Sequence, residues 1–296
     1  MPRILYFTVP DAYDGKKLSV FMRGGVNMSY SLYATLRHTE GSVTRDGAVV
    51  RSIDRVNGGD VIRVVLPDIG CEIIPTPMEL SVIYEDEDIL VLNKSGYTAV
   101  HPSHGHREDT LANGVVHYLK SKGMNGAFRA VGRLDKGTSG VVVCALNTYS
   151  ASRLTDCVEK TYIAIADAEL TESGTVDVPI IRPDPDKTLR ASEESGERAG
   201  THYEVLATGN GKSLLRLRLE TGRTHQIRVH MAHIGAPLTG DSLYGTVTDC
   251  GRHMLHCYTV NLTHPVSGLK MTFTAPFPQE FQKEIDVNFG KVLKLY

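Results

Sequence analysis

The sequence contains no long apolar run. A membrane-spanning helix needs about 18 or more consecutive apolar residues, and no run in this chain of 296 residues reaches that length. Near its start the chain has one short apolar run, followed by acidic residues and paired lysines. A secretory signal needs a longer apolar stretch than this. The sequence therefore predicts a soluble, cytoplasmic protein that does not associate with a membrane.

A strong excess of charge of one sign is also missing. The chain has 32 basic and 34 acidic residues, which gives a net charge of -2. A strongly basic nucleic-acid-binding protein would show a large positive excess, so that class is excluded for the chain as a whole. A basic cleft on one face is still compatible with this total, because whole-chain charge says nothing about how the charges are distributed.

Cysteine is scarce, and its number is odd. Five cysteines are spread widely, at positions 71, 144, 157, 250 and 257. A chain of this length, with 41% apolar residues, can build a core without disulfide bridges. We therefore expect reduced thiols and a folded globular protein.

Several catalytic and binding motifs are missing as well. The run GRLDKGTS (132–139) looks like a phosphate-binding loop, but Thr138 stands where that loop needs its lysine. There is no Gly-x-Ser-x-Gly elbow and no His-Glu-x-x-His helix. Residues 250–257 hold two cysteines and two histidines, without the separated ligand pairs of structural zinc sites. We predict that the protein needs no nucleotide, metal or other cofactor.

The pattern of short elements changes near residue 70. Before it come two short helical patterns, two β-like runs around the turn Asp46-Gly47, and a strand at Val61–Val65. Residues 1–68 contain nine basic and seven acidic residues, so this part is net positive. Residues 69–80 contain two prolines and are predicted to be a linker. A second domain is predicted for residues 81–296.

In that second part, strands outnumber helices. A hairpin is predicted from Val82–Tyr84 and Ile89–Leu92, and a helix after Asn147. Residues 184–200 are polar and predict a mobile loop. The predicted helices and strands do not alternate regularly along the chain. This pattern favours an α+β fold with a mixed, mostly antiparallel sheet over a doubly wound fold. Further strands are predicted at 141–146, 162–166, 202–207, 214–219 and 270–274.

Two polar blocks carry the chemistry. The first, GRLDKGTSG (132–140), places Asp135 between two cations in a glycine-rich turn before an apolar strand. The second, TGRTHQIRVH (221–230), is rich in hydrogen-bond donors, which suit an anionic ligand or phosphates. Each block alone could be a capped surface turn, but two such blocks on one chain favour a functional site.

These blocks are where the chain resembles a known family. The second domain resembles the RluA-type pseudouridine synthases over residues 82–281, most specifically in RLDK-TSG and TGRTHQIRVH. The first domain resembles the S4-like RNA-binding module in KKLSVFMR, EGSVTRDGAVV and NGGDVIRVVL. The family often has histidine before Arg-Leu-Asp, whereas this chain has Gly132. We therefore assign no imidazole to that position.

The resemblance implies an isomerase that converts specific uridines in structured RNA to pseudouridine without a cofactor or metal. It implies Asp135 as the essential aspartate, Tyr162 as the aromatic partner of the base and Arg223 as the cation beside Asp135. Asp135 could act as a nucleophile or assist proton loss from C2′ of the ribose. The other residues that we expect to contact the RNA substrate are Arg133, Leu134, Lys136, Thr138, Gln226, Arg228 and Leu255.

The expected partner is RNA. Ribosomal RNA is the family's usual target and transfer RNA is the alternative, and we expect a monomer. Two other functions are considered for this chain. A non-catalytic RNA-binding protein with a degenerate synthase domain is disfavoured, because Asp135, Tyr162 and Arg223 are all present. A glycosidase would usually pair two carboxylates about the scissile bond, and the first block offers only one.

Overall fold

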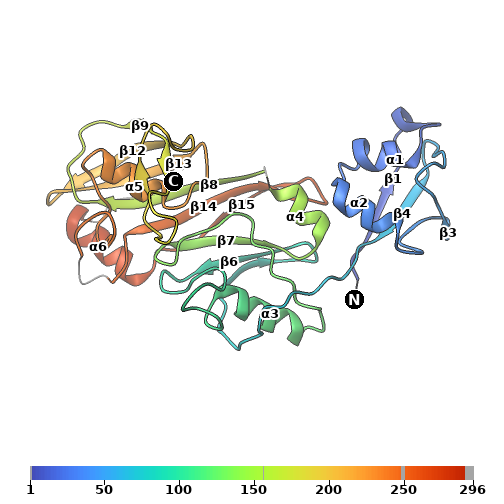
Figure 1. Cartoon of the computed structure of the whole chain (residues 1–296), viewed down its shortest axis with the longest axis horizontal. Helices are drawn as coiled ribbons and strands as arrows, with labels where there is room; N and C mark the ends of the chain where they lie inside the picture. Colours follow the sequence, from blue (N-terminus) through green and yellow to red (C-terminus); the bar gives the residue numbers. More distant parts are fainter. Residues whose placement is uncertain (1, 156, 248–250, 291–296) are drawn as a thin grey trace.

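The computed structural model describes residues 2–155, 157–247 and 251–290. Its strands form a small N-terminal sheet and a large sheet (Figure 1). Among these residues, no helix has the length and apolar character that a membrane crossing requires. The N-terminal elements are β1 (Ile4–Thr8), the 3₁₀ helix η1 (Asp11–Tyr13), α1 (Leu18–Val20), the π-helical turn η2 (Phe21–Gly25), α2 (Tyr30–Arg37), β2 (Val43–Arg45), β3 (Ala48–Val49) and β4 (Val61–Val65).

The N-terminal sheet has the order β1-β4-β2-β3, with all neighbours antiparallel. The turn between β2 and β3 is Asp46-Gly47, and both residues have positive φ, as a tight hairpin turn requires. Ser29 caps α2 by accepting the Leu32 N–H. Strand β1 was not predicted, because its short apolar run gave no periodic signal; it pairs with β4 along its whole length.

The larger part of the chain follows a segment, 67–81, that contains no helix or strand. Its strands are β5 (Val82–Glu85), β6 (Ile89–Lys94), β7 (Ser139–Ala145), β8 (Val158–Ala166), β9 (Gly174–Asp177), β10 (Ile180–Ile181), β11 (Ala191–Ser192), β12 (Gly200–Gly209), β13 (Lys212–Leu219), β14 (Leu255–Thr263) and β15 (Lys270–Thr274). Its helices are α3 (Leu111–Ser121), α4 (Thr148–Leu154), α5 (Gln226–His233) and α6 (Gln279–Phe289).

The large sheet has the order β5-β6-β7-β14-β8-β13-β12-β9, and β15 pairs with the second half of β14. Only β7 and β14 are parallel, and every other pair is antiparallel. This confirms the prediction of an α+β fold with a mixed, mostly antiparallel sheet. The parallel pair matters for the site, because residues that precede β7 and residues that begin β14 meet at the same edge.

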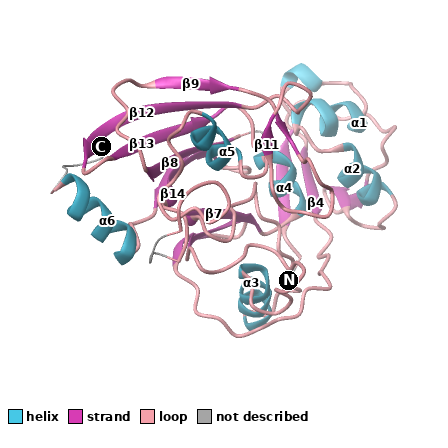
Figure 2. Cartoon of the chain, turned by 60° about the vertical axis from the view of Figure 1, so that its left-hand side comes forward, coloured by secondary structure: helices cyan, strands magenta, loops and turns pink. Residues whose placement is uncertain are grey.

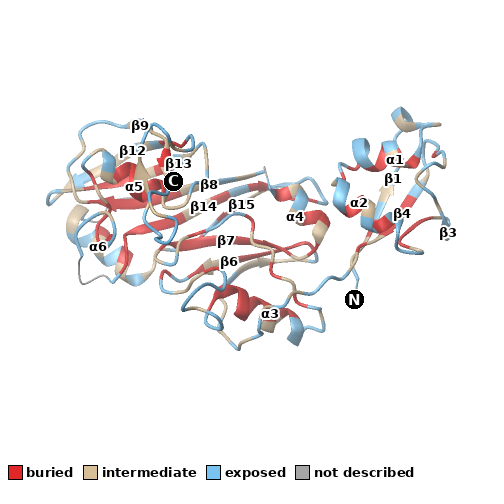
Figure 3. Ribbon diagram, viewed as in Figure 1, coloured by how far each residue is buried: buried red, intermediate tan, exposed pale blue. Residues whose placement is uncertain are grey.

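Strand β8 shows how the two faces of the sheet are filled. Its residues Tyr162, Ala164 and Ala166 join the main core with α5, whereas Ile163 and Ile165 pack with the α6 side chains on the opposite face. Alternate residues of a strand point to opposite faces, so α5 and α6 cover different sides of the sheet (Figure 2). Buried residues run along β6 and β7, the centre of this core (Figure 3).

The predicted mobile loop at 184–200 is partly wrong. Within it, β11 pairs with β10, and β12 begins at Gly200. Ile180 of β10 is buried in a small cluster with Ala199 and Val229, and this burial stabilises the short hairpin. The polarity of the segment concealed these few apolar contacts.

The N-terminal sheet contacts the large part of the chain through α4. The Tyr149 ring is buried in the N-terminal core, where it lies 5.7 Å from the Phe7 ring, and its hydroxyl donates to the Val26 carbonyl at 3.1 Å. In Figure 1, α4 lies at the end of the large sheet, beside the N-terminal unit. This aromatic side chain therefore ties the two sheets together.

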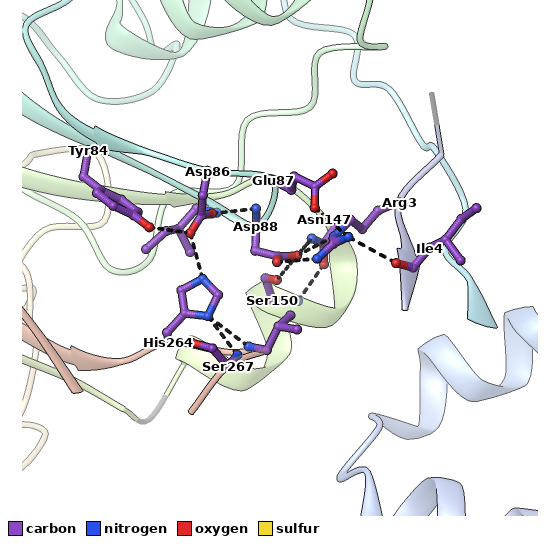
Figure 4. Close-up of polar contacts among 12 residues, drawn as sticks. Arg3, Ile4, Tyr84, Asp86, Glu87, Asp88, Asn147, Ser150, His264 and Ser267 are labelled. Carbon is purple, nitrogen blue, oxygen red and sulfur yellow. Dashed lines mark hydrogen bonds and ion pairs between the residues drawn. The ribbon is translucent and has the colours of Figure 1, made fainter. Parts of the chain in front are cut away.

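A charged contact supports the same junction (Figure 4). The Arg3 guanidinium donates to both carboxylate oxygens of Asp88, at 3.0 and 2.8 Å. This contact joins the residue before β1 to the β5–β6 turn. Asn147 donates to the same carboxylate at 2.8 Å while its own side-chain oxygen caps α4. Asp88 is almost fully buried, so this paired geometry compensates for the loss of its hydration.

Among the described residues, one group of side chains could hold a metal ion, because its ligand atoms all lie within 4.8 Å of one another. The group consists of Asp86, Asp88 and His264. Their ligand atoms are already engaged. His264 accepts backbone N–H groups at Nδ1, so its Nε2–H donates to Asp86 at 2.9 Å. The Tyr84 hydroxyl also donates to Asp86. The group acts as a hydrogen-bond network that shapes the turn on which Arg3 docks.

Arg3→Met should loosen the N-terminal unit. The change leaves a buried carboxylate with one fewer charged partner, which we expect to cost about 1–3 kcal/mol because Arg3 is partly exposed. Small-angle scattering should show a larger radius of gyration, and proteolysis within 67–81 should be faster. Arg51→Met is the matched control, since Arg51 is exposed and forms no ion pair among the described residues. Equal behaviour of the two variants would contradict this role of Arg3.

Candidate active site

A cleft of about 970 Å³ lies on the large sheet and brings the two polar blocks together. Its walls come from the turn before β7, the first half of β8, the end of β13 with the loop that follows it, and the start of α5 and β14. Of the residues predicted from sequence, the cleft is lined by Arg133, Leu134, Asp135, Thr138, Tyr162, Arg223, Gln226, Arg228 and Leu255. Lys136 does not line it.

The lining of the cleft is basic although the chain is slightly acidic. It contains five cationic side chains and three carboxylates, whereas the whole chain has a net charge of -2. Such a concentration of positive charge attracts a polyanion. The cations are Arg133, Lys160, Arg218, Arg223 and Arg228.

Asp135 lies in a tight turn at the entrance to β7. Its carbonyl accepts the Thr138 N–H at 3.0 Å, and β7 begins at Ser139. Gly140 has a φ of +112°, and a Cβ there would lie 2.1 Å from the Cys257 carbonyl oxygen. Only glycine allows β14 to approach β7 this closely, which explains the glycine of the Thr-Ser-Gly motif.

Two buried cations hold this turn from behind. The Lys94 ammonium donates to the carbonyls of Ser95, Thr98 and Lys136, and Arg252 donates to the Gly137 carbonyl at 2.9 Å. Burial lowers the pKa of Lys94 to about 7. The sequence analysis missed both residues, because a lysine that ends an apolar strand gave no sign that it reaches a turn 42 residues away.

The cation beside Asp135 is Arg228, which corrects the expectation that it would be Arg223. The Arg228 Nη1 atom lies 3.5 Å from Oδ2 of Asp135, and its side chain is only 6% exposed. Arg223 lies in the loop before α5, is 41% exposed, and pairs with Glu197. Helix α5 begins at Gln226, so its third residue points into the cleft while the loop arginine turns away from Asp135.

Asp241 fixes the position of Arg228. Its two carboxylate oxygens accept the guanidinium Nε and Nη2 at 2.7 and 2.8 Å, a two-point contact in which Asp241 is fully buried. The Tyr244 ring lies 5.0 Å from the same guanidinium. Because Asp241 and Tyr244 hold one side of the fork, Nη1 is directed toward Asp135.

Tyr162 and Leu255 form the apolar wall of the cleft. Tyr162 is buried on β8, and burial raises its pKa well above the usual value, with the nearby Cys257 and Asp135 adding to the effect. Its phenol therefore stays neutral at physiological pH. Leu255 is buried at the start of β14, where it pairs with Ala164 of the same β8 strand.

Of the remaining residues predicted to contact RNA, some are exposed and others are buried or already hydrogen-bonded within the protein. Arg133 is exposed at the cleft, whereas Lys136 lies 3.1 Å from the His106 Nε2 atom outside it. Leu134 is buried in the main core. The Thr138 hydroxyl bonds to His253. The Gln226 amide is fully engaged: it accepts from Thr221 and Arg223 and donates to Gly200 and Thr201.

Gly132 marks the place where the family often has histidine. Its φ is +75°, and a Cβ would lie 2.7 Å from the Lys160 ammonium. A larger side chain at this position would therefore strain the backbone and displace Lys160.

The histidines and cysteine of the 250–257 run point to different partners. His253 bonds to Thr138, while His256 bonds to Ser139 and the Ala275 carbonyl. Burial lowers the pKa of His253 to about 3 and that of His256 to about 4. Cys257 contacts the Tyr162 hydroxyl. Cys250 lies outside the described residues, and the four described cysteines are free thiols.

His225 is a cleft residue for which no role of its own was predicted from the sequence. It precedes α5 in the left-handed conformation, with φ 59° and ψ 17°. Its Nε2 atom lies 3.8 Å from Asp135 Oδ2, and its Nδ1 atom lies 2.8 Å from the Tyr244 hydroxyl. Burial lowers the pKa of His225, the nearby Asp135 opposes this, and Arg228 and Arg190 lower it further.

Comparisons with known proteins identify the family of this chain. The family model for RNA pseudouridylate synthases matches residues 88–233. The uncharacterized RNA pseudouridine synthase YjbO of Bacillus subtilis (strain 168) is 34% identical over 272 residues, which cover 88% of this chain and 96% of that protein. The chain belongs to the RluA-type RNA pseudouridine synthase family. It is therefore an isomerase whose substrate is RNA.

Other members of the RNA pseudouridine synthase family extend the comparison. The ribosomal large subunit pseudouridine synthase D of Escherichia coli (strain K12) is 38% identical over 233 residues, which cover 72% of each chain. Among solved structures, human RNA pseudouridylate synthase domain containing 1 aligns with a TM-score of 0.59 and 28% identity, covering 73% of this chain and 91% of that one.

The two arginines of the second block should differ in their effect on this pseudouridine synthase. Arg228→Lys keeps the charge but loses the planar fork that joins Asp241 to Asp135, so we expect turnover to fall by about 100-fold or more. Arg223→Lys, the matched control in the same motif, should change turnover by less than about 10-fold. Single-turnover rates on one RNA would test this, and a larger loss for Arg223→Lys would restore the original assignment.

Proposed function

We propose that this pseudouridine synthase modifies uridines in ribosomal RNA and that Asp135 is its catalytic carboxylate. The target class is suggested by relatives that are named for the large ribosomal subunit. The observation that carries the assignment of Asp135 is its position in a basic cleft, with the Arg228 guanidinium on one side of its carboxylate.

The reaction exchanges one bond to the ribose for another. The bond between C1′ and N1 of uracil breaks, the base turns, and a bond forms between C1′ and C5. The C5 proton is then lost and N1 carries a proton, so no atoms are gained or lost. An ionised Asp135 can attack C1′ as a nucleophile or take the C2′ proton, and both roles need a free carboxylate oxygen facing the ribose.

The target base has to leave the helical stack to reach the cleft, at a cost of a few kcal/mol. Stacking on the Tyr162 ring would return about 1–3 kcal/mol of this. Leu255 would contact the base from the neighbouring strand, and the exposed Arg133 would hold phosphates at the entrance. Because its pKa is raised, the phenol of Tyr162 would meet the base without adding negative charge beside Asp135.

Residues 1–68 would act as an RNA anchor, as their S4-like pattern suggests. Several cations on this unit are exposed and form no ion pair within the described chain, which leaves them free for phosphates. They are Lys16, Lys17, Arg23, Arg37 and Arg51. By contrast, Arg45 is committed to Asp60 at 2.6 Å. The docked arrangement through Arg3 and Tyr149 would hold the anchor at a fixed distance from the cleft.

Asp135→Asn tests the catalytic assignment. The substitution is nearly isosteric, so the thermal midpoint should stay close to that of the wild type, whereas the charge and the nucleophilic oxygen are lost. Pseudouridine formation should fall by at least about 10³-fold. Turnover should be measured on a ribosomal RNA fragment that the wild-type enzyme modifies. Retention of a tenth of the wild-type rate would show that Asp135 is not the catalytic residue.

Lys16→Gln/Lys17→Gln tests the RNA anchor. Each lost phosphate contact should flatten the log-log dependence of RNA affinity on salt by about 0.7–0.9, while turnover at saturating RNA is kept. Lys283→Gln on α6 is the control for the loss of an exposed charge. An unchanged affinity and salt slope in the double variant would remove the anchoring role of these two lysines.

A further inference from the structure

The two oxygens of the Asp135 carboxylate have different surroundings. Oδ2 faces both the Arg228 guanidinium, at 3.5 Å, and the His225 imidazole, at 3.8 Å. Oδ1 has no hydrogen-bond partner among the described residues, and the closest nitrogen of each of these two side chains lies nearest to Oδ2. Oδ2 is therefore flanked by two nitrogen-containing side chains of the protein, whereas Oδ1 can contact a substrate in the cleft.

The hydrogen bonds around Tyr244 determine which nitrogen of His225 carries the proton. The backbone N–H of Arg190 donates to the Tyr244 oxygen at 2.8 Å, so the phenolic proton is available for His225 Nδ1, also at 2.8 Å. Burial raises the pKa of Tyr244, so its hydroxyl keeps this proton. The imidazole Nε2 faces a carboxylate oxygen, and only a nitrogen that bears a proton is attracted to it. The neutral tautomer therefore carries its proton on Nε2.

The backbone of His225 is held in an uncommon conformation at this position. A non-glycine residue with φ of 59° costs free energy and persists where the surroundings require it. The conformation places the ring between Tyr244 and Asp135, at the N-terminal end of α5. The strained backbone and the aligned ring contacts are thus separate observations that concern the same residue.

We infer that His225, with its tautomer fixed by Tyr244, is a positioning residue whose neutral Nε2–H holds Oδ2 of Asp135 and so directs Oδ1 at the ribose. This inference rests on the proposed role of Asp135 and adds a residue to it. The distance of 3.8 Å exceeds that of a hydrogen bond. The contact tightens when RNA fills the cleft and excludes water.

The neutral state of the imidazole is part of this role. A positively charged ring would pair with Asp135 and weaken its attack on the ribose. Burial and the neighbouring arginines lower the pKa of His225 although Asp135 opposes them, and a donor on Nδ1 further disfavours protonation there. The titratable and charged groups that face this ring are Asp135, Arg190, Arg228, Asp241, Tyr244 and His253.

Tyr244→Phe tests the inference with little other change. The phenylalanine ring can still cover the Arg228 guanidinium, but it cannot donate to Nδ1. The pKa of His225 should then rise by about one unit, so the imidazole becomes charged at a higher pH than in the wild type. The single-turnover rate should show a new loss on the acid side when followed from about pH 5 to 8. Tyr203→Phe removes a hydroxyl outside the cleft and should keep the wild-type profile.

The double variant Tyr244→Phe/His225→Gln identifies the group that titrates. Glutamine can offer an N–H to Asp135 but cannot become charged, so the acid-side loss should disappear. His225→Gln alone should keep activity within about 10-fold of the wild type, whereas His225→Leu should lose about 100-fold. An acid-side loss that persists in the double variant, or equal rates for His225→Gln and His225→Leu, would overturn the inference.

Nitrogen-15 spectra of labelled histidine provide a readout that does not depend on activity. The His225 signals, assigned by their absence in His225→Gln, should show the Nε2–H tautomer in the wild-type protein at neutral pH. The Nδ1–H tautomer or a charged ring would overturn the inference.

If Asp135→Asn is inactive while the His225 variants behave as wild type, only this inference fails. If Asp135→Asn is active, the proposed function of Asp135 fails.

Discussion

The active site depends on the two-point contact between Arg228 and Asp241. Asp241 is fully buried, and its carboxylate holds the guanidinium from the loop after α5. The free end of the same guanidinium reaches Asp135 on the turn before β7. One planar cation thus fixes a helix, a loop and the turn that carries Asp135 relative to one another. A lysine could supply the charge, but it could not supply this geometry.

The sequence was informative where the chemistry is local. The strands and the Asp46-Gly47 hairpin follow from apolar alternation and turn residues, and Asp135 stands out as a carboxylate between two cations. The choice between Arg223 and Arg228 was wrong for a physical reason. Both belong to one donor-rich run, and what separates them is the residue at which α5 begins. That boundary is set by tertiary packing, which the run itself does not reveal.

Contacts between distant segments were beyond the reach of sequence patterns. Lys94 supports the turn that carries Asp135 through a carbonyl 42 residues away, and Arg3 docks on Asp88 across 85 residues. In both cases a polar side chain next to an apolar strand looks like an ordinary surface residue until the fold buries it. No role was predicted for His225, because neither its backbone conformation nor its contact with Tyr244 leaves a signal in the residue spacing.

The position of β14 has a consequence for how the enzyme becomes active during synthesis. This strand lies between β7 and β8, so in the sheet as described it alone joins the β5-β6-β7 half to the β8-β13-β12-β9 half. It comes late in the chain, at Leu255–Thr263. Because pairings between such distant segments form late and slowly, a nascent chain would hold two unjoined half-sheets, with Asp135 and Tyr162 on separate pieces. The synthase would therefore gain its RNA cleft only as its last strands leave the ribosome.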